Sequence, residues 1–71
     1  MNPAELDKIF TYHRPKSGQP ETYEAIRETG RSLAILINRS CPDSREKSVA
    51  ITKVQEAVMW ANASIAIHQS E

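Results

Sequence analysis

REKSVAITKVQEAVMWANASIAIH, residues 45–68, is the stretch that decides the fold, because it contains neither glycine nor proline and nothing in it would interrupt a helix. At about 100° per residue, it places two apolar stripes on roughly opposite faces of one helix. The first stripe comprises Ile51, Val54, Val58, Ala61 and Ile65, and the second comprises Val49, Trp60, Ala63 and Ile67, with Met59 at its edge. We expect the second stripe to be covered either by other helices of the chain or by another copy of it.

The chain is short for a self-sufficient domain. It has 71 residues, and a domain of this size buries only about 60% of the surface that its unfolded chain exposes. Cys41 is the single cysteine, so no disulfide can join two parts of the chain. Assembly of several copies is the remaining source of stability, and we expect function to depend on it.

Charge and hydropathy exclude several classes of partner. The formal net charge is zero and the isoelectric point is about 6.7, which argues against a DNA-binding protein with a strongly basic face. No apolar run approaches the roughly 20 residues of a membrane span, and MNPAELDK at the start is not a signal peptide. We therefore expect a soluble, intracellular protein with no membrane partner.

Capping patterns mark where the helices begin. Asn2 can cap a short helix from Pro3 to about Ile9, whose apolar residues Leu6, Ile9 and Phe10 would dock on the larger helices. The predicted fold class is all-α: one domain, residues 1–71, with an N-terminal helix in 1–10, a ligand-binding loop at 11–19, and an antiparallel hairpin of two long helices at 20–40 and 44–68.

The two long helices carry further signals. Gln19 or Gly18 is the expected cap of the second helix, and Asp43 or Ser44 that of the third. Gly30 costs about 1 kcal/mol relative to alanine inside a helix, so we expect another backbone to approach closely there. The apolar stripe of the second helix comprises Tyr23, Ile26, Gly30, Leu33, Ala34 and Ile37.

No catalytic set is evident. Cys41 and the serines lack a neighbouring histidine with an orienting acid, so we do not expect an enzyme. His13 and His68 are the two histidines, too few for a metal site without further ligands. No cofactor is expected.

Aromatic and basic side chains gather in the loop Tyr12-His13-Arg14-Pro15-Lys16. A tyrosine ring offers a face on which a nucleobase can stack, and guanidinium groups bind phosphate. Arg27 and Arg31, one helical turn apart, form a second basic pair. The alternative is that these arginines are solvated and pair with Glu24 and Glu28.

Four segments resemble the type 2 bacteriophage anti-CBASS protein family, whose members are cyclic-oligonucleotide sponges. They follow the family's order over nearly the whole chain. They are Phe10-Thr11-Tyr12-His13, Tyr23-Glu24-x-Ile26-Arg27, Cys41-Pro42-Asp43-Ser44-Arg45-Glu46-Lys47-Ser48 and Glu56-Ala57-Val58-Met59-Trp60-Ala61-Asn62-Ala63-Ser64-Ile65-Ala66.

This resemblance implies a compact homohexamer of helical protomers. It implies binding of cyclic dinucleotides such as cyclic GMP–AMP (cGAMP) between protomers and, in members that do so, of cyclic trinucleotides in separate pockets. Such a protein would sequester the messenger in the host cell cytoplasm without cutting it, so that the host's CBASS effector stays inactive.

The resemblance also implies roles for individual residues. Tyr12 would stack on a base of the cyclic dinucleotide and Arg27 would hold phosphate, with His13 and Thr11 as neighbours. Thr29 and Arg31 are candidates for the trinucleotide pocket.

One departure from the family's pattern concerns this second pocket. Ile67 stands where the family often has a basic residue, and His68 points about 100° away on a helix. The departure bears on trinucleotide binding more than on dinucleotide binding.

Two other functions remain as alternatives. The chain could be a small helical module that docks on a host protein through the Trp60 stripe. It could also degrade the messenger rather than hold it, although no catalytic set supports this.

Overall fold

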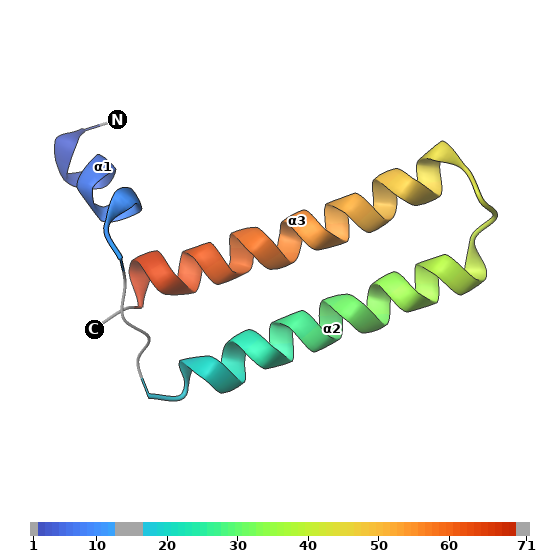
Figure 1. Cartoon of the computed structure of the whole chain (residues 1–71), viewed down its shortest axis with the longest axis horizontal. Coiled ribbons are helices and arrows are strands. Elements are labelled where there is room, and N and C mark those ends of the chain that lie inside the picture. The colour runs from blue at the N-terminus through green and yellow to red at the C-terminus, as the bar shows by residue number, and fades with distance from the viewer. Residues whose placement is uncertain (1, 13–16, 70–71) are drawn as a thin grey trace.

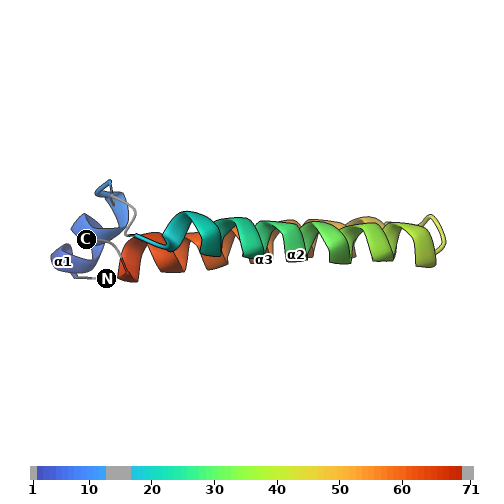
Figure 2. The same cartoon turned by 90° about the horizontal axis from the view of Figure 1, so that it is seen from below.

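The computed structural model describes residues 2–12 and 17–69, and the described part contains three helices and no strand (Figure 1). Helix α1 spans Pro3–Phe10, α2 spans Gln19–Ser40 and α3 spans Arg45–His68. The α2 and α3 helices run antiparallel and side by side, and α1 lies at the end of the hairpin where α3 finishes (Figures 1 and 2). The predicted all-α class with a helical hairpin is confirmed.

Side-chain caps fix the starts of α1 and α3. The Glu5 N–H donates to Oδ1 of Asn2 at 2.8 Å, and Pro3 occupies the first turn. The Lys47 N–H donates to Oγ of Ser44 at 3.1 Å, so Ser44 rather than Asp43 caps α3. Each cap satisfies a backbone donor that the first turn of a helix leaves unpaired.

The start of α2 is built differently. Gly18 is the residue before the helix and has a φ of 86°, a left-handed conformation that costs a side-chain-bearing residue about 1–2 kcal/mol. Gln19 belongs to α2 and not to the preceding loop, where the sequence placed it. Its side chain is only 6% exposed, and its Nε2 donates to the Gln69 carbonyl at 2.6 Å. This bond joins the start of α2 to the end of α3.

Gly30 marks the close approach of the two long helices. A Cβ atom at Gly30 would lie 2.5 Å from Cγ2 of Val58 and 3.7 Å from Cγ1 of Val54. The predicted close contact is therefore present, but the approaching group is a valine side chain rather than a backbone. The hydrogen atom of glycine leaves room for that valine.

Helix α1 lies near the last turns of α3, on the side away from α2, and extends beyond that end of the hairpin (Figure 1). Ile9 lines a groove there together with Ala63 and Ile67. Phe10, by contrast, is 84% exposed, so the expectation that it docks on the larger helices of its own chain is wrong. Leu6 is also exposed.

The isolated chain has no closed core. Among residues 2–12 and 17–69, no apolar side chain is fully buried. The molecule measures 45 × 29 × 11 Å and is one helix layer thick (Figure 2). Its radius of gyration is 15.4 Å, against about 11 Å for a compact domain of this length.

The other helices of the chain cover the two apolar stripes of α3 to different extents. The first stripe faces α2 and is half-buried throughout. On the second stripe, Ala63 and Ile67 are half-buried beside α1, whereas Val49 and Trp60 are exposed. The chain's own helices thus cover only part of the second stripe. No helix in the described ranges combines the length and apolar character needed to cross a bilayer.

Candidate functional site

The hairpin carries a groove along the α2–α3 seam on each of its two flat faces. The first, which we call the basic groove, has Arg27 and Arg31 at its rim and encloses about 310 Å³. Its floor is apolar, so two positive charges lie beside a surface on which a sugar or a nucleobase could pack. Its lining residues are Arg27, Gly30, Arg31, Ala34, Ile51, Val54, Gln55, Val58 and Met59.

The groove on the opposite face, which we call the threonine groove, contains Thr29 and encloses about 430 Å³. Thr29 lies two residues from Arg27 and two from Arg31, about 200° around the helix from each, so it cannot share their face. The threonine groove is lined by Ile26, Thr29, Gly30, Leu33, Lys53, Val54, Ala57, Val58 and Ala61.

Both grooves share one floor. Gly30, Val54 and Val58 line the two of them, because the hairpin is a single layer and glycine contributes no side chain. A change at any of these residues alters both faces.

The two arginines of the basic groove differ in their partners. Nη1 of Arg31 lies 4.0 Å from Oε2 of Glu28, and both side chains are more than half exposed, so this ion pair contributes little. Arg27 makes no ion pair within residues 2–12 and 17–69. The alternative was that these arginines pair with Glu24 and Glu28. In the described residues, Arg31 forms a weak pair with Glu28, and Arg27 forms none with Glu24.

Neither Thr11 nor Tyr12 is brought to either groove within one chain. Tyr12 is 83% exposed and lines neither groove. The Thr11 hydroxyl donates to the Asp7 carbonyl and so is engaged at the end of α1. His13 lies outside the described residues. One chain therefore brings Arg27 and Arg31 together, sets Thr29 on the other face, and leaves Tyr12 apart from all three.

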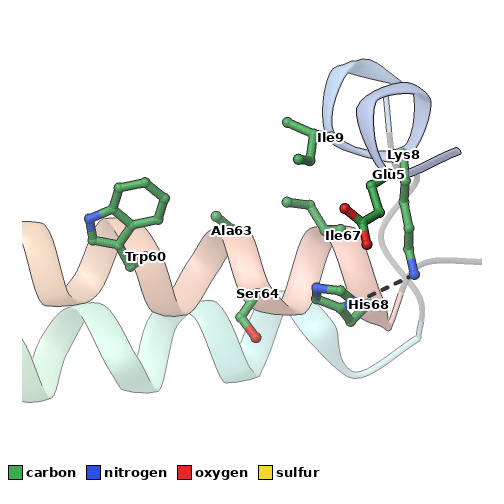
Figure 3. Close-up of a pocket in the computed structure, with 8 residues that line it drawn as sticks. All are labelled: Glu5, Lys8, Ile9, Trp60, Ala63, Ser64, Ile67 and His68. Carbon is green, nitrogen blue, oxygen red and sulfur yellow. Dashed lines mark hydrogen bonds between the residues drawn. The ribbon is translucent and has the colours of Figure 1, made fainter. Parts of the chain in front are cut away.

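A third groove, between α1 and α3, was not predicted. We call it the α1 groove; it encloses about 420 Å³ (Figure 3). At one end, Nζ of Lys8 lies 3.4 Å from Nδ1 of His68. The spacing of Glu5, Lys8 and Ile9 along one face of α1 is the signal that could have revealed it. It is lined by Glu5, Lys8, Ile9, Trp60, Ala63, Ser64, Ile67 and His68.

The α1 groove also explains why position 67 is apolar in this chain, where the family that the sequence resembles often has a basic residue. Ile67 points into this groove beside Ile9 and lines neither groove of the hairpin seam (Figure 3). Within the described ranges, no three potential metal ligands gather at one place. The polar chemistry that the hairpin faces offer is that of arginine, threonine, glutamine and lysine side chains.

Comparison with known proteins gives one result. A family model described as Acb2/Tad1, hairpin domain, matches residues 2–66, which is nearly the whole chain. The match covers both seam grooves completely and the α1 groove except for Ile67 and His68. No curated protein and no solved structure matches the chain.

Proposed function

We propose, since this chain belongs to the Acb2/Tad1 hairpin family, that it is a non-enzymatic sponge. It binds cyclic dinucleotide second messengers and withholds them from the host's CBASS antiviral signalling, in the cytoplasm of the host cell. The observation that carries the proposal is the basic groove, in which Arg27 and Arg31 flank an apolar floor on a hairpin of this family.

The chemistry of the basic groove suits a cyclic dinucleotide. Such a ligand has two phosphodiester anions and two flat bases. Arg27 and Arg31 are one turn apart, and a guanidinium can donate two parallel hydrogen bonds to one phosphate. Arg27 has no ion-pair partner in the described ranges that a phosphate would have to displace. The apolar floor beside Met59 leaves a surface for the sugar or base.

A second copy is needed to complete the site. Pockets that hold small molecules tightly cover most of the ligand, and a groove on a single-layer hairpin covers one side only. Tyr12 is exposed and far along the chain from Arg27, so a neighbouring copy in a homohexamer would supply the ring that stacks on a base. His13 and Thr11 would then lie near the same ligand.

The threonine groove is the proposed place for cyclic trinucleotides. Thr29 and Arg31 line opposite faces of one chain, so both could reach one ligand only if Arg31 came from another copy. Within one chain Ile67 lines the α1 groove, so it would reach this ligand only from another copy, and it offers no charge where the family often has a basic residue. We therefore expect cyclic trinucleotides to bind more weakly than cyclic dinucleotides.

Calorimetry on site variants tests this assignment. Tyr12→Ala and Arg27→Ala should each weaken cyclic-dinucleotide binding at least tenfold, about 1.4 kcal/mol, because one loses a stacking face and the other a phosphate contact. Arg39→Ala is the matched control, since Arg39 is an exposed arginine near the end of α2 that lines neither seam groove. Light scattering should give the same mass for all variants. Unchanged affinity in both site variants would refute the assignment.

Ligand recovery separates a sponge from an enzyme. The complex is heated, and the released nucleotide is identified by mass spectrometry. A sponge returns the intact cyclic nucleotide in the amount bound. A linear or shortened product would show that the protein degrades its ligand.

One observation favours a second candidate function. Trp60 is 73% exposed, which is unusual for the largest apolar side chain of a protein and suits docking on a host protein. In that case the chain would be a monomer that binds none of a panel of cyclic di- and trinucleotides. A hexamer that retains one of them would exclude this alternative.

A further inference from the structure

Two exposed aromatic side chains lie at the same end of the molecule. Trp60 forms part of the wall of the α1 groove and is 73% exposed, and Phe10 at the end of α1 is 84% exposed. Phe10 cannot enter the groove of its own chain, because its neighbour Ile9 faces that groove and successive residues point about 100° apart on a helix.

We propose that Phe10 of a second copy inserts into the α1 groove beside Trp60, and that the exchange is reciprocal. The inference rests on the proposed function only in that it requires copies of the chain to assemble. It assigns an interface that lies outside both seam grooves, and so leaves these open to ligands.

The groove has room for a phenyl ring and an apolar wall on which the ring can rest. It encloses about 420 Å³, whereas an apolar cavity of about 150 Å³ is enough to hold benzene. Trp60, Ala63 and Ile67 project from α3 toward the side on which Ile9 lies, and they form an apolar channel (Figure 3). A ring in this channel can meet the Trp60 indole in the offset or edge-to-face arrangement that aromatic pairs prefer.

The layout favours a second copy over an unrelated partner. A two-fold interface uses the same patch on both subunits, so that patch must carry both the inserted group and its receptor. Phe10 and the α1 groove meet this condition, since the helix that carries Phe10 also forms one wall of the groove (Figure 3). An unrelated partner that filled only the groove would leave Phe10 exposed.

The exposed area is large enough for such an interface. The chain exposes 5646 Å², whereas a folded monomer of 8.0 kDa exposes about 4,450 Å². This excess is greater than the roughly 800 Å² that each partner buries in a standard interface. The chain thus has enough excess surface to bury one interface of this size against another copy of itself.

Photo-crosslinking tests the contact directly. The ring of Phe10 is replaced by its photoreactive counterpart, Phe10→p-benzoylphenylalanine, and this copy is assembled with an isotope-labelled copy of the native sequence. Illumination should join position 10 of one copy to the segment 60–67 of the other, and the isotope label identifies the bond as intermolecular. The same replacement at Leu36 is the control, because Leu36 is an exposed apolar residue of α2 outside the α1 groove.

Dilution supplies a second measurement. Phe10→Ala should raise the concentration at which the assembly dissociates at least tenfold, and Phe10→Leu should have a smaller effect. Crosslinks from position 10 that stay within one copy, or that map to other segments, would overturn the inference. Neither experiment contains a nucleotide, so an assembly that binds cyclic dinucleotides without this crosslink would refute the interface and leave the proposed function intact.

Discussion

Asp43 and Ser44 are adjacent residues with separate tasks at the start of α3. Ser44 accepts the backbone N–H of Lys47, and Oδ1 of Asp43 accepts a hydrogen bond from Nζ of the same lysine at 2.7 Å. The Lys47 side chain is only 11% exposed, so its aliphatic stem packs on the hairpin while its ammonium reaches Asp43. The hydrogen bond and the positive charge of Lys47 lower the pKa of Asp43 below its usual value near 3.8.

This lowered pKa predicts an acid dependence of stability. Because the pKa of Asp43 is lower in the folded chain than in the unfolded chain, its contribution is full above the unfolded value near 3.8. The contribution is lost as the pH falls through the folded pKa. Carbon NMR titration of Asp43 should therefore show a midpoint below the usual range, and Lys47→Met should raise it.

Lys53→Met is the control for this titration. Lys53 is another surface lysine, and it pairs with Glu56 at 3.4 Å instead. Its replacement should leave the Asp43 midpoint where it was. If Lys47→Met leaves the titration midpoint of Asp43 unchanged, the Lys47–Asp43 ion pair does not persist in solution.

At the scale of elements, the α2–α3 packing depends on Gly30. Replacement of Gly30 by alanine has two opposing effects. It gains about 1 kcal/mol of helix propensity, but the new Cβ would lie 2.5 Å from Cγ2 of Val58. Overpacking of this kind typically costs about 1–3 kcal/mol. We expect the cost of overpacking to exceed the gain in helix propensity. Gly30→Ala should therefore lower the free energy of unfolding, measured by chemical denaturation.

A double-mutant cycle separates the two effects. Val58→Ala removes the opposing methyl groups, so Gly30→Ala should be better tolerated in that background than in the native one. Ser32→Ala, on an exposed position of the same helix, tests propensity without a clash and should be neutral or slightly stabilising. Equal effects of Gly30→Ala in both backgrounds would contradict the close packing.

The shared floor of the two grooves adds a consequence for binding. Gly30, Val54 and Val58 line both the basic and the threonine groove, so a shift of the helices at Gly30 changes the shape of both. Gly30→Ala should therefore weaken cyclic-dinucleotide binding even though no ligand-contacting side chain is altered. Affinity restored by the added Val58→Ala would confirm that the effect comes from helix spacing.

At the scale of the whole molecule, stability should depend on concentration. The described part of the chain has no fully buried apolar side chain, so a single copy has little to offset the entropy of folding. If assembly supplies the missing burial, mass action makes the thermal midpoint rise with protein concentration. Differential scanning calorimetry over a wide concentration range measures this. A constant midpoint for a well-folded monomer would contradict both the assembly and the proposed composite site.

Much of the local structure was predictable because it depends on neighbouring residues. Asn2 and Ser44 stand directly before their helices, and the 24 residues of α3 contain no helix breaker.

The candidate site was predictable only in part. Arg27 and Arg31 were expected on one face because they are one turn apart, but their groove also needs Met59 and Gln55 from α3. The placement of Tyr12 and His13 against a ligand stays a prediction.

The sequence by itself determined that this chain is helical, where its helices begin, and that its apolar surface exceeds what a single hairpin can cover. These properties follow from capping groups and from the period of the helix, which act over a few residues. The tertiary structure alone decided which surfaces meet. It brought the Val58 side chain onto Gly30, set Gln55 and Met59 of α3 beside the two arginines, and pointed Ile9 rather than Phe10 at α3. These outcomes depend on how two helices rotate against each other, and that rotation is fixed by side chains far apart in the sequence.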